Sequence, residues 1–195
     1  ILMIKIGIID LKINNIKSII NAAKLFGNTY LINSLADYKE DTNVLILPGN
    51  GSFFQGMKIV KENSYDKLIF DFVKKNKKLI GICLGLQLLM DSSEEAKDVL
   101  GLSLIEGSVK KLNEKNLKVP LLGWYDVSFK NDIKTQSFYF NNGFIVEPIK
   151  KDLIQGSINN TIPAYVAKEN IHGFQFHPEK SSHHGVKLLG ETILK

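Results

Sequence analysis

The feature that most constrains this chain is the stretch at residues 78–90, where a short apolar run leads straight into a leucine-rich segment. Residues 79–82 have the length and composition of a buried strand, and the leucines that follow are typical of the start of a helix. Cys83, the only cysteine in the chain, stands at the junction, with Gly81 and Gly85 two residues to either side. The stretch therefore predicts a strand and a helix joined by a tight turn that carries a thiol.

This turn has two interpretations. A lone cysteine is more often a buried core residue than a reactive one. Glycines on both sides also fit a turn that presents a nucleophile, the thiol counterpart of the G-x-S-x-G elbow, where the N-terminal end of the helix favours the thiolate. A second segment favours the reactive interpretation, because residues 173–181 read as a strand that delivers His177, with Glu179 two residues later.

Composition places the chain among ordinary globular proteins, with 44% hydrophobic and 23% charged residues over a length of 195. We expect a single domain spanning residues 1–195. No apolar run reaches the ~18 residues that a membrane span needs, and no secretory signal is recognisable. A single cysteine excludes an internal disulfide and a cysteine-based zinc site, so we expect a cytoplasmic protein with no membrane partner.

The net charge of +5 raises the question of nucleic-acid binding. All of the basic residues are lysines, and they are scattered along the chain rather than clustered with aromatic residues. Recognition of phosphates and bases relies heavily on the two-pronged hydrogen bonding of arginine, which this chain lacks. We therefore expect no nucleic-acid partner.

The first half of the chain alternates between strands and helices, which predicts right-handed βαβ units on a parallel sheet. We expect strands at residues 4–9, 29–32, 44–47 and 79–82, and helices at 16–26, 54–60, 65–75 and from 84. From residue 101 onward, Asn, Gly and Pro separate short extended runs at 104–112, 126–129, 138–140, 144–146, 164–167 and 173–176, before a last helix after Gly185. The predicted fold class is α/β, a mostly parallel central sheet flanked by helices, with a β-rich insertion in the C-terminal half.

Active sites of open α/β sheets lie outside the carboxyl ends of the strands. Cys83, the loop at residues 49–51 and the pair His177 and Glu179 each follow a predicted strand. The loop exposes backbone N–H groups without bulky side chains, and it could bind an oxyanion together with the amide of Leu84. An imidazole held by a carboxylate suits a cysteine nucleophile at neutral pH. These groups predict acyl transfer through a thioester that water releases.

Residues 81–87, Gly-Ile-Cys-Leu-Gly-Leu-Gln, together with His-Pro-Glu at 177–179, resemble the motifs of the class I (triad) glutamine amidotransferases. This resemblance implies that glutamine is hydrolysed to glutamate and ammonia, and that the ammonia passes to a synthase partner. We expect no metal and no cofactor. The roles that it implies are Cys83 as nucleophile, His177 as base, Glu179 as the residue that orients the base, Gln87 as part of the glutamine pocket, and Gly49, Asn50 and Gly51 as the oxyanion strand.

Further motifs are similar to those of the glutaminase subunits of imidazole glycerol phosphate synthase, the HisH type. They are L-P-G-x-G-x-F at 47–53 with G-M at 56–57, G-L-x-L-I-x-G-x-V at 101–109, V-P-x-x-G-W at 119–124 and Q-F-H-P-E-K-S at 175–181. The resemblance implies a heterodimer with a (β/α)8-barrel cyclase in histidine biosynthesis, with L-glutamine as the substrate. The partner interface that it implies contains Asn15, Trp124, Tyr139 and Lys180.

Three segments depart from the pattern of that family. Residues 10–15 read Asp-Leu-Lys-Ile-Asn-Asn where Asp-Tyr-Gly-x-Gly-Asn is usual, residues 120–125 read Pro-Leu-Leu-Gly-Trp-Tyr in place of Pro-His-Met-Gly-Trp-Asn, and residues 139–144 read Tyr-Phe-Asn-Asn-Gly-Phe in place of Tyr-Phe-Val-His-Ser-Tyr. In the family these segments lie at or near the synthase. A diverged paralogue that supplies ammonia to another synthase, such as one that amidinates a nucleotide or a surface sugar, is therefore an alternative. A catalytically silent binding subunit is a third hypothesis, against which the complete set of cysteine, histidine and glutamate argues.

Overall fold

The computed structural model describes residues 3–13, 16–113, 118–130 and 135–195, and its centre is a nine-stranded sheet. The strands of this sheet are β1 (Lys5–Ile9), β2 (Asn28–Ile32), β3 (Val44–Gly49), β4 (Lys78–Cys83), β7 (Leu121–Phe129), β8 (Gln136–Asn142), β10 (Ile154–Ile158), β11 (Ile162–Lys168) and β12 (Ile171–Phe174). A smaller sheet contains β5 (Ser92–Ser93), β6 (Gly107–Lys111) and β9 (Phe144–Pro148). The helices are α1 (Ile16–Ala23), α2 (Phe53–Glu62), α3 (Tyr65–Lys74), α4 (Leu84–Leu88) and α5 (Ser182–Leu194), and 3-10 turns lie at η1 (Leu35–Asp37), η2 (Lys151–Leu153) and η3 (Pro178–Lys180).

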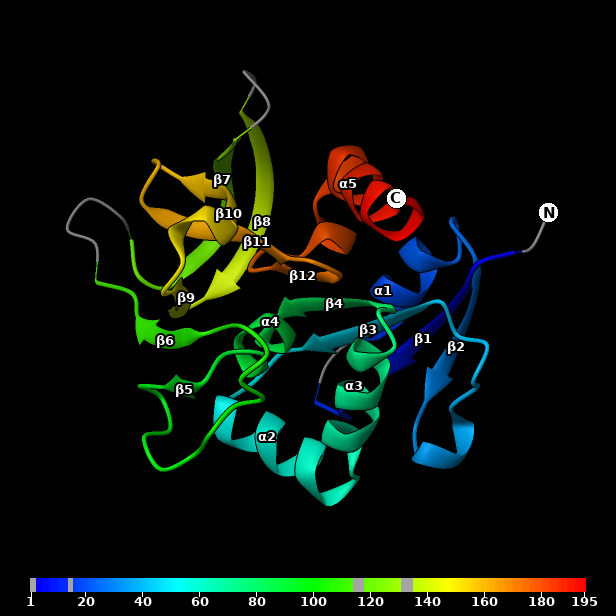
Figure 1. Ribbon diagram of the computed structural model, residues 1–195. Coiled ribbons are helices and arrows are strands. Elements are labelled where there is room, and N and C mark those ends of the chain that lie inside the picture. Colours follow the sequence, from blue (N-terminus) through cyan, green and yellow to red (C-terminus); the bar gives the residue numbers. More distant parts are fainter. Residues whose placement is uncertain (1–2, 14–15, 114–117, 131–134) are drawn as a thin grey trace.

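The large sheet has the order β2-β1-β3-β4-β12-β11-β10-β7-β8. Neighbouring strands from β2 to β12 run parallel. Neighbouring strands from β12 to β8 run antiparallel. The mostly parallel sheet predicted from the sequence is confirmed, and the β-rich half continues the same sheet beyond β12 (Figure 1). This continuation matters for function because it places a strand from late in the chain, β12, directly beside β4.

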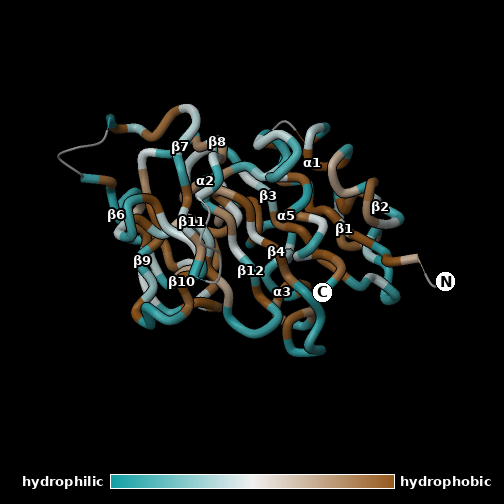
Figure 2. Tube along the Cα trace, turned by 90° about the horizontal axis from the view of Figure 1, so that it is seen from above, coloured by the Kyte–Doolittle hydropathy of each residue, from teal (hydrophilic) through white to brown (hydrophobic). Residues whose placement is uncertain are grey.

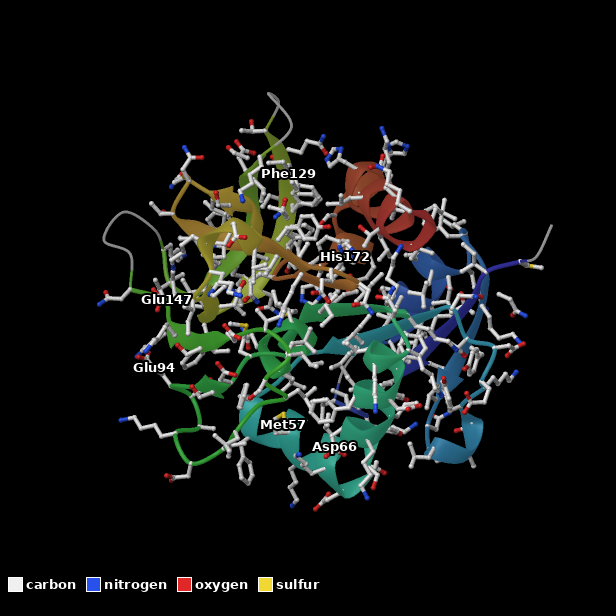
Figure 3. All side chains as sticks on the ribbon, viewed as in Figure 1. Met57, Asp66, Glu94, Phe129, Glu147 and His172 are labelled. Atoms are coloured by element: carbon white, nitrogen blue, oxygen red, sulfur yellow. The ribbon has the colours of Figure 1, made fainter. Side chains whose placement is uncertain are left out.

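Helices cover both faces of the parallel half, with α1 and α5 on one face and α2 and α3 on the other (Figure 1). Successive strand residues point to opposite faces. Leu45 accordingly shares a core cluster with Met57, which extends from α2 toward the sheet (Figure 3). Ile46 instead belongs to a cluster with Ile19 of α1 and Leu189 of α5. Figure 2 shows the resulting concentration of hydrophobic residues along the central strands.

Several strands differ from the sequence prediction: β5 was not predicted, β7 begins at Leu121 rather than at residue 126, and two further differences have a clear physical cause. β10 was not predicted, because Gly156 interrupts its apolar pattern; a Cβ there would lie 3.1 Å from ring atoms of Phe129. The strand predicted at 104–112 begins at Gly107, because the N–H groups of Leu104 and Ile105 donate to the carbonyl O of Leu89 at 2.9 and 3.0 Å instead of to a strand. Both differences come from contacts with residues distant in sequence.

Two helix boundaries differ from the prediction by three residues or more. The first helix ends at Ala23 rather than at residue 26. The last begins at Ser182 rather than after Gly185, and Gly185 lies inside it because a Cβ there would be 2.3 Å from the carbonyl O of Pro178. No helix in the described part of the chain is long and apolar enough to cross a membrane.

Candidate active site

β4 passes directly into α4, and Cys83 is the residue at the turn. Its φ of 54° and ψ of −111° are a conformation that a non-glycine residue adopts only under strain. The flanking glycines permit the turn, because a Cβ at Gly81 would lie 2.8 Å from the backbone N of Leu86, and one at Gly85 only 1.7 Å from the backbone O of Leu47. The predicted strand-to-helix elbow is confirmed, and its strain falls on the cysteine itself.

β3 ends beside this elbow, with Gly49 directly opposite Cys83 in the parallel register. A Cβ at Gly49 would lie 2.8 Å from the Cβ of Leu84, so only glycine allows so close an approach. Leu84 is the first residue of α4, and N–H groups in a first helical turn have no partner within the helix. Asn50 and Gly51 continue the loop at the surface. The arrangement places backbone N–H groups where they can meet an anion formed at Cys83.

His177 and Glu179 follow β12 and are held together by η3. The Nδ1 of His177 lies 2.9 Å from the Oε1 of Glu179, and the two side chains are 5% and 6% exposed. Burial by itself lowers the pKa of the imidazole, but its interactions with Cys83 and Glu179 outweigh burial and raise the pKa to about 9. His177 Nε2 has no hydrogen-bond partner among the described residues, and it is the ring nitrogen left for Cys83.

A buried serine that sequence reasoning missed anchors this histidine to β8. The Oγ of Ser181 donates to the carbonyl O of His177 at 2.6 Å and accepts from the N–H of Tyr139 at 2.9 Å. The N–H of His177 donates to the carbonyl O of Tyr139 at 2.9 Å. The available signal was the position of the serine just after the His-Pro-Glu segment, where a short hydroxyl side chain can bind the backbone of the preceding turn.

The site is closed. Cys83 is 4% exposed, and its Sγ lies 4.0 Å from the carbonyl O of Asn141. The cavity that His177 and Glu179 line with residues 49–50 has a volume of about 40 Å³, which holds about one water molecule and no amino acid. Larger cavities of about 640 and 590 Å³ lie elsewhere and contain none of these residues. A substrate the size of an amino acid therefore cannot enter without movement of the surrounding loops.

The sequence matches the model of the glutamine amidotransferase class-I family over residues 8–194. This chain belongs to that family. Relatives include the imidazole glycerol phosphate synthase subunit HisH of Halalkalibacterium halodurans, 35% identical over 94% of this chain and 92% of the relative, and that of Bacillus subtilis, 35% identical over 94% and 93%. The subunit HisH 1 of Methanococcus maripaludis is 34% identical over 96% of this chain and 98% of its own length.

Solved structures agree on the fold of this amidotransferase. A crystal structure of a glutamine amidotransferase superposes with a TM-score of 0.78 at 16% identity and covers 96% of this chain and 97% of that one. PurLQS from Thermotoga maritima gives 0.76 at 16% identity and covers 99% and 98%. At these identities the likeness concerns the fold alone.

Gln87 of the amidotransferase is held in a buried cluster of carboxamides. Its Nε2 donates to the carbonyl O of Phe144 at 3.0 Å and to the Oε1 of Gln175 at 3.3 Å. The Nδ2 of Asn142 donates to the same carbonyl at 2.9 Å. A backbone carbonyl can only accept a hydrogen bond, so the carbonyl of Phe144 must face the NH₂ groups of Gln87 and Asn142. The amide oxygens of these two side chains therefore point away from that carbonyl. Sequence reasoning named Gln87 as a pocket residue but not these supports, which only the folded chain brings together.

The residues named as a partner interface lie on the β7–β8 pair and on η3. Trp124 is 52% exposed and packs edge-on against Tyr139, with ring centroids 6.1 Å apart. Lys180 is exposed and forms no ion pair with another described residue. Leu122 adds an apolar side chain that is 63% exposed. Asn15, the fourth named residue, lies outside the described residues.

Proposed function

We propose that this amidotransferase is the glutaminase subunit of imidazole glycerol phosphate synthase, which hydrolyses L-glutamine to glutamate and ammonia and delivers the ammonia to the cyclase subunit in histidine biosynthesis. The observation that carries the proposal is the buried set of Cys83, His177 and Glu179 at the carboxyl ends of β4 and β12. Relatives that bear this name, 35% identical over nearly their whole length, support the choice of pathway. The free thiol favours the cytoplasm as the compartment.

In the proposed reaction, the Sγ of Cys83 attacks the amide carbon of glutamine. The negative oxygen that forms is stabilised by the N–H groups of Leu84 and of residues 49–51. The C–N bond then breaks, and the leaving nitrogen takes the proton of His177 Nε2, which yields ammonia and a thioester. The neutral imidazole next takes a proton from a water molecule as that water attacks the thioester, and collapse releases glutamate and the thiolate.

The proton balance of this scheme depends on Glu179. A pKa of about 9 means that His177 is protonated at neutral pH, the form that can give a proton to the leaving nitrogen. The carboxylate of Glu179 stabilises this imidazolium and fixes the ring so that Nε2 is the nitrogen facing Cys83. Removal of the carboxylate charge therefore weakens both the acid and its orientation.

Gln87 lies four residues after Cys83, on the same side of the elbow helix. Its amide nitrogen is committed to two acceptors inside the protein, so its oxygen is the end available to a substrate N–H. This orientation supports a role in binding the glutamine substrate.

The proposed partner is a (β/α)8-barrel cyclase that forms a heterodimer across the surface bearing Trp124, Tyr139 and Lys180. A half-exposed tryptophan that is braced by a second aromatic ring suits the centre of an interface. Lys180, without an ion-pair partner among the described residues, is free to pair with a carboxylate of the synthase.

One observation favours the alternative, a paralogue that serves a different synthase. Leu122, which is 63% exposed beside Trp124, replaces the usual methionine of the HisH-type motif, and Leu121, which is buried, replaces its usual histidine. The loss of the histidine beside Trp124 favours a partner that does not present a matching polar group there. The alternative keeps the glutaminase chemistry and changes only the recipient of the ammonia.

The test is a glutaminase assay with and without the synthase. We expect glutamate formation to be lost in Cys83→Ala, while the synthase in the same complex still makes its product from added ammonium. Substantial glutamine turnover by Cys83→Ala contradicts the assignment of the nucleophile. A wild-type complex that binds the synthase but never hydrolyses glutamine supports the silent binding subunit instead.

A further inference from the structure

A second cavity lies at the end of the sheet opposite the triad. Its volume is about 640 Å³, and its wall contains Lys78, the first residue of β4, and His172, the second residue of β12. Cys83 ends β4 and His177 follows β12, so the same two parallel strands carry the catalytic residues at their other ends. The volume is within the range of small-molecule sites. No residue of the triad lines this cavity, so it is separate from the site that we assign to glutamine.

Lys78 and His172 lie on the same face of the sheet. His172 is opposite Ile80 in the parallel register, and Lys78 precedes Ile80 by two residues, so all three side chains point to the same side. The helix α5 packs on this side. The carbonyl O of Ile193, near the end of α5, accepts from the ammonium of Lys78 in a long contact of 3.5 Å. The two basic side chains therefore share the space between β4, β12 and α5.

The ammonium of Lys78 lacks a carboxylate. The side chain is half-buried, burial lowers its pKa, and no carboxylate among the described residues lies within ion-pair distance of it. The other lysine of the wall, Lys195, lies 3.5 Å from Glu191. A partly buried cation without an opposite charge is costly, and an anion in the cavity would offset that cost. The charge that the wall lacks is therefore a single negative one.

His172 supplies a second polar group to the cavity. Burial and the ammonium of Lys78 lower the pKa of the imidazole to about 4, so the ring is neutral at neutral pH. Its Nδ1 lies 2.9 Å from the hydroxyl O of Tyr165, and its Nε2 has no hydrogen-bond partner among the described residues. When the hydroxyl donates to Nδ1, the ring proton is on Nε2 and can be donated to a ligand.

The rest of the wall limits the charge and the shape of the anion. Glu169 and Glu191 line the cavity, and their carboxylates disfavour an anion that carries two or more charges. The ring of Tyr165 and the side chain of Leu188 add an aromatic and an aliphatic surface. This chemistry fits a single carboxylate attached to an apolar or aromatic body better than it fits a phosphate.

We propose that this cavity is a binding site for a small organic monocarboxylate, which accepts hydrogen bonds from the ammonium of Lys78 and from the Nε2–H of His172 while its apolar part contacts the aromatic and aliphatic wall. The hydroxyl of Tyr165 donates to Nδ1 and thereby sets the tautomer of the imidazole. The inference does not depend on the reaction at Cys83, because the two sites occupy opposite ends of β4 and β12.

The test uses benzoate as the carboxylate probe, benzamide as its uncharged counterpart of similar shape, and phenyl phosphate as a doubly charged anion. Binding to the full chain is followed by the imidazole NMR signals of His172 and by calorimetric titration. We expect benzoate to perturb these signals and to bind about tenfold more tightly than benzamide, because it gains a charge-assisted hydrogen bond.

Two lysine variants locate the anion. Lys78→Met keeps the length of the side chain and removes its charge, and we expect it to weaken benzoate binding about tenfold. Lys187→Met is the matched control, because it removes an exposed lysine of α5 that does not line the cavity. Its affinity for benzoate should stay within about twofold of the wild type.

Absence of benzoate binding, or equal affinity for benzoate and benzamide, overturns the inference. So does an unchanged affinity in Lys78→Met, which would leave Lys78 with the C-terminal end of α5 as its only partner. Tighter binding of phenyl phosphate than of benzoate contradicts the carboxylate and assigns the site to phosphate ligands. Thermal unfolding establishes whether Lys78→Met is folded, and the comparison of the three probes decides the matter on the wild-type chain if it is not.

Discussion

Gly85 makes the closest backbone approach at the candidate site, so its replacement by alanine tests the geometry of the elbow. A Cβ there would lie 1.7 Å from the carbonyl O of Leu47 and 2.7 Å from the carbonyl C. Neither atom belongs to a side chain that can rotate away. In Gly85→Ala, α4 and β3 must therefore separate by more than an ångström.

This separation affects stability and activity in different ways. Overpacking a close-packed site commonly costs about 1–3 kcal/mol, and because the clash is with backbone we expect a loss of about 3 kcal/mol in the free energy of unfolding. The same movement carries the N–H of Leu84 away from Gly49, where we place the oxyanion. Loss of one oxyanion donor lowers kcat by roughly 10²–10³-fold.

Alanine substitutions at two further glycines test whether the damage follows the severity of the steric clash. In Gly49→Ala the new Cβ meets the Cβ of Leu84 at 2.8 Å, a milder clash with a side chain. In Gly143→Ala the nearest atom is the Cβ of Pro120 at 3.8 Å, an ordinary contact, so we expect a change within about 0.5 kcal/mol. Glutaminase kcat/KM in the complex and urea unfolding of each variant are the measurements. Wild-type activity and stability in Gly85→Ala, or equal damage in Gly143→Ala, would refute the reasoning.

Other predictions concern charge, control and docking. Because folding raises the pKa of His177 from 6.5 to about 9, the stabilisation from its charge, up to about 3 kcal/mol, is complete below pH 6.5 and is lost as the pH rises through 9. Glu179→Gln should shrink this difference in urea unfolding; an unchanged difference contradicts the ion pair. The isolated subunit should hydrolyse glutamine slowly, because the site is closed, and the synthase should raise the turnover roughly 10²–10³-fold. Near-maximal turnover by the subunit without the synthase would contradict this prediction. Trp124→Ala should weaken binding of the synthase by about 2 kcal/mol in calorimetric titration, with Trp124→Phe as the control. The free energy of unfolding of the isolated subunit should change little. An unaltered affinity would show that Trp124 is not part of the interface. If Leu122 and its neighbours suit a different synthase, a typical histidine-pathway cyclase should bind weakly, since each buried polar group left unpaired costs about 1–3 kcal/mol; equal activation by both would show the substitutions to be neutral.

The amino-acid sequence determined the parallel half of the fold and the choice of the candidate reactive groups. Apolar runs at β1, β3 and β4 can only be buried on both faces, and the intervening helical patterns supply the cover that a parallel sheet needs. The Gly-x-Cys-x-Gly spacing fixed the elbow, because local close approach requires glycine at those two positions. The amidotransferase motifs carried the expected roles of Cys83, His177 and Glu179.

Local pattern was a poorer guide in the second half of the chain. The strand β10 escaped prediction because its central Gly156 makes sense only against the ring of Phe129 on β7. The first turn of α5 was missed because Gly185 is required by contact with Pro178, not by a local break. In both places a residue that signals an interruption locally is a packing requirement in the folded chain.

Only the tertiary structure decided how the site is assembled. Pairing of β12 with β4 brings His177 to Cys83, and β8 supplies both the carbonyl O of Asn141 beside the thiol and the anchor for Ser181. The Oε2 of Glu179, which has no partner among the residues that the structure describes, and the cavity beside it likewise have no signature in the sequence. Local propensities act over a few neighbouring residues, whereas burial, closure and a missing hydrogen-bond partner depend on which distant segments the completed sheet places side by side.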